Sequence, residues 1–264
     1  MFISHKYRVI FVHIQRTGGN SIQKLFETWD PDLIEIIPFN PINNRTKHCF
    51  ISDIKAVIDS DIFQNYTKFS VVRNPYDRIL SWYLMFNQGF GADDATMVIE
   101  NSKYMNFFLQ IHNFLPKYFR NGQSLKYKVA LAKFFRKNLT DSEQIAIQYI
   151  NTGANVMLEV NKNIRCFEDF IKLPIENKLF NRFYINQLDY LSEQEVIIDR
   201  ILKFENLNND FNHLASEIGF KGKLPHLNKS TRNKSYQSYY NENIRQEISQ
   251  RFKRDIEYFS YQFE

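Results

Sequence analysis

Residues 7–22, with the sequence YRVIFVHIQRTGGNSI, restrict the fold most, because a strand, a tight turn and a helix start follow one another there. Residues 8–13 are dense in Val, Ile and Phe, which is typical of a buried strand. Two consecutive glycines let the backbone of the turn pass close to a ligand, and the amides of a helix N-terminus favour an anion. The stretch therefore predicts a phosphate or sulfate cradle. Its cation, glycines and hydroxyls are Arg16, Thr17, Gly18, Gly19 and Ser21.

A second strand, turn and helix start occupies residues 68–86. Residues 68–73 have an apolar middle that predicts a strand, and Asn74 followed by Pro75 indicates a helix cap and the first helical residue. Strands that alternate with helices indicate an α/β domain with a mainly parallel sheet. In such sheets ligands bind outside the carboxyl ends of the strands, where both turns are expected.

The remaining periodic segments complete the expected fold. We expect further strands at residues 33–38 and 199–204. We expect helices at residues 20–29, 53–58 with Ser52 as N-cap, 167–173, 206–218 ending at Gly219, and 241–259. Residues 87–158 contain helical patterns but no convincing strand. The chain of 264 residues is therefore predicted to be a single domain, residues 1–264, with a helical insertion at about 87–158 that either covers the site or is purely structural.

Charge and composition limit the partners. The net charge of +5 suits an anionic ligand but is well below that of a protein with a dominating basic patch, so no nucleic-acid partner is expected. Cys49 and Cys166 form neither a disulfide framework nor a metal-ligand cluster. No signal peptide opens the sequence and no apolar run approaches the roughly 18 residues of a membrane span. We therefore expect a soluble, cytoplasmic protein with no transmembrane segment.

The glycine turn differs from the loop of nucleotide triphosphatases. That loop, GxxxxGK[ST], has its Lys after the second Gly, whereas Arg16 precedes the glycine pair. Nor does a strand end in a clear Mg²⁺-binding Asp. These residues disfavour a metal-dependent kinase or ATPase, and a purely structural turn remains an alternative.

A second anion site is predicted from Arg73 and Ser81. Arg73 ends a strand, and Ser81 falls near the second turn of the following helix, from which it can face back towards Arg73. A guanidinium and a hydroxyl suit a phosphomonoester, although Arg73 could instead form a salt bridge with Asp77. Two anion sites at neighbouring strand ends suggest one ligand with two separated phosphate-like groups.

Three segments carry a family resemblance. They are the loop VHIQRTGGNS, the segment KFSVVRNPYDRILSWY, and the late segments ILKFENLNNDFNHLASEIGF and LPHLNKSTRNKSYQSYY. They resemble the carbohydrate sulfotransferases that use 3′-phosphoadenylyl sulfate (PAPS), in the branch with heparan-sulfate and chondroitin-type enzymes and bacterial relatives. The resemblance covers both ends of the chain but not residues 87–158. It implies a P-loop-like three-layer fold with helices on both faces of the central sheet.

The resemblance also implies residue roles. The first loop, residues 16–21, would hold the 5′-phosphosulfate of PAPS, and Arg73 and Ser81 would contact its 3′-phosphate. The family's usual Lys is Arg16 here, which keeps the charge but cannot move a proton. Its usual Thr is Asn20, which still donates hydrogen bonds. The basic loop with Lys229, Ser230 and Arg232 would form a lid over the 3′-phosphate and adenine, with a solvated loop as the alternative.

Transfer to a hydroxyl also needs a base, and we predict His48. Sulfuryl transfer is expected to be in line and metal-independent, with Arg16 stabilising the leaving phosphate. Histidine, with an ordinary pKa near 6.5, suits proton abstraction at neutral pH. His48 lies in a polar loop between the two motifs, and the resemblance also puts the base there; the alternative is an exposed loop histidine. Glu205 is expected to fix this end of the site.

The sequence thus predicts a PAPS-dependent sulfotransferase that modifies a hydroxyl of a glycan acceptor. A lipid or a small metabolite is the alternative acceptor. Two other functions stay open, a metal-dependent phosphotransferase and a non-catalytic module that binds a nucleotide or an anion.

Overall fold

The computed structural model describes residues 1–35, 48–87, 160, 164–174, 176, 180–224 and 235–264. The chain divides into two compact units. One consists of Met1–Ser81 with Asn181–Glu264, and the other of Trp82–Phe180. Apart from Asn87, the predicted helical insertion lies outside the described residues, and so do Lys229, Ser230 and Arg232. The whole sheet and all other predicted site residues belong to the first unit.

The centre of the first unit is a five-stranded sheet in the order β3-β1-β2-β4-β5. Strands β2, β4 and β5 run parallel, while β1 pairs antiparallel with both β2 and β3. The α/β class is thereby confirmed, with an antiparallel edge that makes the sheet mixed. The strands are β1 (Phe2–Ser4), β2 (Val9–Val12), β3 (Ile34–Glu35), β4 (Thr67–Val72) and β5 (Arg200–Lys203).

The helices of the described residues have the following bounds: α1 (Gly19–Trp29), α2 (Ile51–Val57), α3 (Ser60–Asn65), α4 (Pro75–Asn87), α9 (Phe167–Ile171), α10 (Gln187–Leu191), α11 (Leu207–Glu217), α12 (Glu242–Arg251) and α13 (Lys253–Phe259). Three 3₁₀ turns accompany them: η3 (Asn181–Phe183), η4 (Phe204–Asn206) and η5 (Tyr236–Tyr239). In the second unit, Phe167 and Phe170 of α9 pack against Tyr83 with ring centroids 5.4 and 6.0 Å away.

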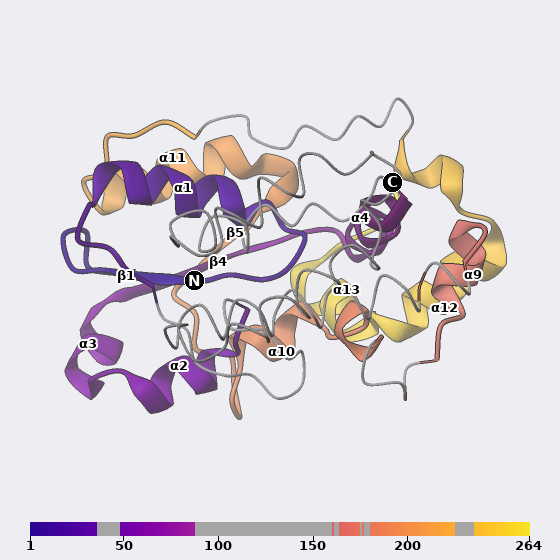
Figure 1. The fold of residues 1–264 in the computed structure, drawn as a ribbon, viewed down its shortest axis with the longest axis horizontal. Coiled ribbons are helices and arrows are strands. Elements are labelled where there is room, and N and C mark those ends of the chain that lie inside the picture. Colours follow the sequence, from indigo (N-terminus) through magenta and orange to yellow (C-terminus); the bar gives the residue numbers. More distant parts are fainter. Residues whose placement is uncertain (36–47, 88–159, 161–163, 175, 177–179, 225–234) are drawn as a thin grey trace, which may run out of the picture. The chain divides into compact units, whose positions relative to one another are not determined.

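Helices cover both faces of the sheet (Figure 1). On one face, Val9 and Phe11 pack against apolar residues of α1 and α11. On the other face, Ile10 and Val12 pack against residues of α2, α10 and α13. Because successive strand residues point to opposite faces, the continuous apolar run of β2 contributes side chains to two hydrophobic cores, one on each face of the sheet. This is the helix–sheet–helix order that the sequence predicts.

Several element boundaries differ from the prediction. Strand β1 and helix α3 were not predicted. Ser52 lies inside α2; the N-cap is Phe50, whose amide donates to the Asp53 carboxylate at 2.9 Å. The single helix predicted at 241–259 is two helices, since the backbone at Phe252 leaves helical geometry (φ −107°, ψ 24°). Gly219 does end α11, with φ +70°.

A buried polar contact lies just after the break between α12 and α13. Asp255, fully buried on α13, accepts hydrogen bonds from the amides of Gln187 and Leu188 at 2.7 and 3.0 Å. Its carboxylate also accepts from the Gln187 side chain at 3.2 Å. Burial raises the pKa of Asp255, and these donors and Arg78 act against that shift. The cluster ties α13 to the start of α10.

Gln187 in turn holds the end of β4. Its side-chain oxygen accepts from the Arg73 amide at 2.8 Å, and its side-chain nitrogen donates to the Arg73 carbonyl at 2.8 Å. The amide group thus pairs with both backbone groups of one residue, as a neighbouring strand would. The position of Arg73 therefore depends on a side chain from another part of the sequence.

We expect Asp255→Ala to lower the free energy of unfolding by about 3 kcal/mol, because the amides of Gln187 and Leu188 lose their acceptor and the Gln187 side-chain nitrogen loses one of its two. Urea unfolding measures this. Asp189→Ala is the matched control: Asp189 forms an ion pair with Arg254 in which both side chains are at least one-third exposed. Its loss should cost about 0.5 kcal/mol. Equal, small losses in the two variants would contradict the role given to Asp255.

Candidate functional site

The predicted site residues gather where the parallel strands end. His13 follows β2, Arg73 follows β4 and Phe204 follows β5. These three strands are neighbours and run in the same direction, so their ends lie at one edge of the sheet. The turn between β2 and α1 crosses this edge.

The turn between β2 and α1 requires glycine at residues 18 and 19. Gly18 is the N-cap of α1 with φ +83°, a left-handed conformation that favours glycine. A Cβ on Gly18 would meet the Phe204 ring at 2.9 Å, and one on Gly19 would meet the His13 ring at 2.3 Å. Arg16 is also left-handed, with φ +65°, although it has a side chain. Such strain at a non-glycine residue often accompanies function.

The start of α1 has the properties of an anion site. No acidic residue lies in its first turn, and its N-cap has no side chain to occupy the first amides. The Ser21 amide donates to the Gly18 carbonyl at 3.1 Å, and the Ser21 side chain is buried. Thr17 is buried as well, and its hydroxyl donates to the Ile14 carbonyl at 3.0 Å. Asn20 is half-buried in the first turn.

Arg73 is almost completely buried and faces the turn. Its Nε and Nη2 donate to Asp77 Oδ2 at 2.9 and 2.7 Å, so the salt bridge weighed as an alternative is present. At the same time its Nη1 donates to the Arg16 carbonyl at 3.1 Å, and its guanidinium lies 4.2 Å from the centre of the Phe204 ring. Arg73 thus contacts the first motif while it is paired with Asp77.

Arg16 and Ser81 connect the two predicted anion motifs. The Arg16 Nε and Nη2 donate to Ser81 Oγ at 3.0 and 2.7 Å. Ser81 lies on the second turn of α4, as the sequence predicts, and is buried. Residues 65 positions apart therefore share one polar cluster, which also contains Arg73.

His48 is not an exposed loop histidine, because only 4% of its surface is accessible. Its Nδ1 lies 2.8 Å from the His13 carbonyl oxygen. A carbonyl can only accept, so Nδ1 carries the proton and the lone pair of the neutral ring is at Nε2. The His13 and His48 rings meet edge to face, with centroids 4.5 Å apart. This tautomer is the one that a base acting through Nε2 requires.

Glu205 holds the start of α4, in agreement with the role expected for it. Its carboxylate accepts from the Asn74 amide at 2.6 Å and from the Tyr261 hydroxyl at 3.1 Å. Asn74 caps the helix, since its side-chain oxygen accepts from the Tyr76 amide at 3.1 Å. Burial and the neighbouring Glu205 raise the pKa of Tyr261. Glu205 therefore links the tail of the chain to the residue beside Arg73.

Sequence reasoning missed three residues around this cluster. Gln187 clamps Arg73 from 114 positions away, and Phe204 lies against both Arg73 and Gly18. Arg78 is buried, and burial lowers its pKa; its Nε donates to the Gln15 carbonyl at 3.0 Å. Arg78 lies one helical turn after Asn74, so its side chain is on the same side of α4 as the end of β4. This spacing is the one sequence signal that could have identified Arg78.

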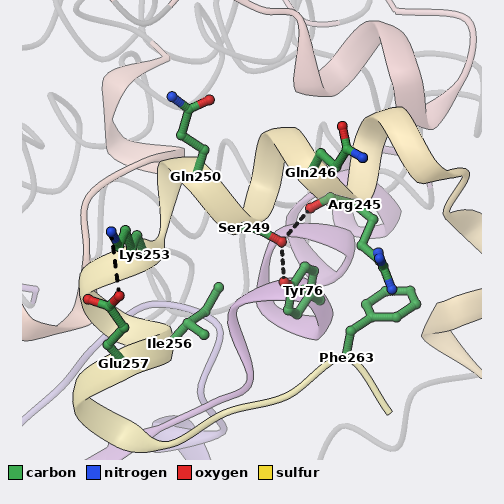
Figure 2. Close-up of a pocket in the computed structure, with 9 residues that line it drawn as sticks. All are labelled: Tyr76, Arg245, Gln246, Ser249, Gln250, Lys253, Ile256, Glu257 and Phe263. Atoms are coloured by element: carbon green, nitrogen blue, oxygen red, sulfur yellow. Dashed lines mark hydrogen bonds and ion pairs between the residues drawn. The ribbon is translucent and has the colours of Figure 1, made fainter.

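A hollow of about 520 Å³ lies elsewhere on the first unit, between the start of α4, the helices α12 and α13, and the tail. Figure 2 shows the residues that line it. Some of its polar side chains are paired with one another. Tyr76 and Ser249 share a hydrogen bond, and Lys253 pairs with Glu257 at 3.6 Å. The predicted site residues are not among those that line the hollow.

Comparison with known proteins decides the family. A family model described as "Sulfotransferase family" matches residues 1–262. The chain belongs to the sulfotransferase family. This confirms the resemblance to sulfotransferases that the three segments carry, and sulfuryl transfer is the chemistry that membership indicates. No curated protein and no solved structure matches the sulfotransferase. Within its described residues, no helix is both long enough and apolar enough to cross a lipid bilayer.

We expect Gly19→Ala to destabilise this sulfotransferase by about 2 kcal/mol, because the new methyl group overlaps the buried His13 ring. Gly219→Ala is the matched control. Nothing lies within 4 Å of a Cβ at Gly219, so only the left-handed backbone opposes it, at about 1 kcal/mol. Thermal unfolding compares the two. A Gly19→Ala protein as stable as the wild type would mean that the His13 ring can move aside freely.

Proposed function

We propose that this sulfotransferase transfers the sulfuryl group of PAPS to a hydroxyl of a glycan acceptor. The observation that carries the proposal is the contact of Arg16 with Ser81, which joins an anion turn and a second cationic motif in one cluster. One ligand with two phosphate-like ends suits such a cluster, and PAPS has a 5′-phosphosulfate and a 3′-phosphate. Family membership supports the same donor.

The described residues fit such a donor. The first turn of α1, which has no acidic residue, and Arg16 would hold the 5′-phosphosulfate. Arg73 and Ser81 would hold the 3′-phosphate, with Asn20 and Ser21 adding donors at the turn. Both Arg73 and Ser81 are buried, so their hydrogen bonds to an anion would be little screened by solvent. Lys229, Ser230 and Arg232 are proposed from the resemblance alone as the lid.

The transfer step needs stabilisation of the leaving group. PAPS supplies a sulfuryl group whose sulfur bonds to the acceptor oxygen as its bond to the 5′-phosphate oxygen breaks, leaving 3′,5′-ADP. Arg16 and the amides of residues 18–21 would stabilise the negative charge that develops on that phosphate. The guanidinium stays protonated throughout, so Arg16 acts by charge and hydrogen bonding only. No metal ion takes part in this scheme.

His48 would remove the proton from the acceptor hydroxyl. Its Nδ1–H donates to the His13 carbonyl, and the proton of the hydroxyl would go to Nε2. The ring is then a cation whose Nδ1–H still faces a carbonyl oxygen, and this contact stabilises the charged form. The buried position of His48 also fixes the ring direction.

The glycan acceptor is supported by the resemblance to carbohydrate sulfotransferases. A lipid or a small metabolite would offer the same hydroxyl chemistry. A transfer screen with labelled PAPS against glycans, lipids and small alcohols tests this part. If the label is transferred to a lipid and not to any glycan, the glycan assignment is overturned while the donor assignment stays in place.

The two competing functions give different results with nucleotides. A metal-dependent phosphotransferase would bind ATP with Mg²⁺ and release ADP. A binding module would take up 3′,5′-ADP without any transfer from PAPS. The proposed sulfotransferase should bind 3′,5′-ADP without Mg²⁺ and label an acceptor. No binding of 3′,5′-ADP in calorimetry would end the proposal.

Arg73→Ala should weaken 3′,5′-ADP binding ten- to a hundredfold, because a charge-assisted pair contributes about 1.5–3 kcal/mol. Binding of 5′-AMP, which lacks the 3′-phosphate, should change little. Arg200→Ala is the matched control, since its side chain is about half exposed and pairs with Glu217. Calorimetry with both nucleotides measures the difference. Equal losses for 3′,5′-ADP and 5′-AMP would show that Arg73 does not read the 3′-phosphate.

His48→Ala should lower kcat for transfer from PAPS at least a hundredfold and leave 3′,5′-ADP affinity within twofold of the wild type. The reason is that Nε2 is needed only for the proton of the acceptor. His213→Ala, at an exposed position of α11, is the control and should keep full activity. If His48→Ala loses nucleotide binding and transfer to the same extent, His48 is not the base.

A further inference from the structure

Gln15 is a buried polar side chain that the proposed reaction has not used. Only 2% of its surface is accessible, yet within the described part of the chain neither Oε1 nor Nε2 has a hydrogen-bond partner. Buried amides are nearly always paired, and an unpaired one costs stability. An amide left in this state next to a reactive loop is therefore an indication that a partner arrives with a ligand.

Arg78 adds a second unsatisfied group in contact with the first residue. Its Nε donates to the Gln15 carbonyl at 3.0 Å and its Nη1 to the Ile185 carbonyl at 2.9 Å. Its Nη2 is buried and has no partner among the described residues. The two residues therefore have three buried atoms without partners: the donors Gln15 Nε2 and Arg78 Nη2, and the acceptor Gln15 Oε1.

The position of Gln15 puts this group of atoms beside the chemistry. Gln15 directly precedes Arg16, and two residues before it is His13, whose carbonyl accepts from His48. Consecutive Cα atoms are about 3.8 Å apart, so the Gln15 backbone lies within several ångströms of the backbones of Arg16 and His13. A ligand group held by Gln15 would therefore bind at the same loop as the proposed catalytic residues.

A hydroxyl matches these atoms, because it donates one hydrogen bond and accepts others. An anion cannot donate to Gln15 Oε1, and an apolar group would leave all three atoms unpaired. Polyhydroxylated acceptors, such as sugars, carry further hydroxyls next to the one that is modified. A site built to bind a hydroxyl strongly disfavours ligands that lack it, since its buried polar groups then remain unpaired.

We propose that the Gln15 amide and Arg78 Nη2 form an acceptor subsite that binds a second hydroxyl of the sugar whose neighbouring hydroxyl is sulfated. The subsite makes Gln15 a specificity-determining residue. This inference rests on the proposed function, because it assigns the same site a polyhydroxylated acceptor. A buried water molecule at these atoms is the competing occupant.

Gln15→Met is the test variant, since it removes the amide and keeps the length of the side chain. Gln250→Met, at an exposed position of α12, is the matched control. Arg78 is left unchanged because two of its nitrogens hold backbone carbonyls. The probes are chondroitin and heparosan tetrasaccharides, titrated by calorimetry in the presence of saturating 3′,5′-ADP, with Tm and 3′,5′-ADP affinity measured on each variant.

We expect the wild type to bind at least one of the two tetrasaccharides, and Gln250→Met to bind that tetrasaccharide with the same affinity. The affinity of Gln15→Met for it should be at least tenfold lower. The Tm of Gln15→Met should be equal to or above that of the wild type, because an unpaired buried amide is removed. Its affinity for 3′,5′-ADP should be unchanged.

Other results overturn the subsite. A lower Tm with unchanged tetrasaccharide affinity would assign the amide to a buried water. Equal losses of tetrasaccharide and 3′,5′-ADP affinity would assign it to the shape of the loop. Binding of 3′,5′-ADP by a wild type that binds neither tetrasaccharide would also overturn the subsite, while the PAPS assignment survives. Failure of the wild type to bind 3′,5′-ADP is a different result, since it rejects the proposed function itself.

Discussion

The side-chain amide of Gln187 continues the hydrogen bonding of β4 beyond its last residue, and the site is built on this contact. The amide pairs with both backbone groups of Arg73, and Asp255 on α13 fixes the amide from behind. Arg73 then reaches the carbonyl of Arg16, and Arg16 reaches Ser81. The polar cluster at the sheet edge is therefore supported from the far end of the sequence, through a buried carboxylate.

Positive charge is concentrated at this edge, and only part of it is paired with a carboxylate in the described contacts. Of the three guanidiniums, Arg73 pairs with Asp77, whereas Arg16 and Arg78 bind a hydroxyl and backbone carbonyls in the described contacts. Burial lowers the pKa of Arg78, and the nearby charge of Arg73 acts in the same direction. A bound anion relieves repulsion between like charges. Family membership and this charge distribution therefore support the same kind of ligand.

Local patterns predicted most of the fold, and distant contacts account for the errors. The strand before the glycine pair, the Asn74 cap and the end of α11 at Gly219 depend on neighbours in sequence and were predicted. Strand β1 has only three residues, too few for a periodic signal. The break at Phe252 is followed by a contact between α13 and α10 that joins distant residues, and the role of Gln187 spans 114 positions. The proximity of Arg16 to Ser81 followed from topology, but their hydrogen bonds required the structure.

The hydrogen bonds from Arg16 to Ser81 have a thermodynamic consequence for a ligand with two ends. In the proposed complex, an anion at the turn draws Arg16 away and leaves the Ser81 hydroxyl available to the second phosphate. The free energy needed to break the Arg16–Ser81 hydrogen bonds is spent only once when both phosphates bind. Binding of one phosphate would therefore favour binding of the other, which is positive coupling. The affinity of 3′,5′-ADP would then exceed what separate 5′- and 3′-phosphates would give by simple addition. The enzyme would thus favour the bisphosphate over the more common monophosphate nucleotides. The contact responsible is the Arg16–Ser81 hydrogen bonding of the free protein, which involves neither phosphate.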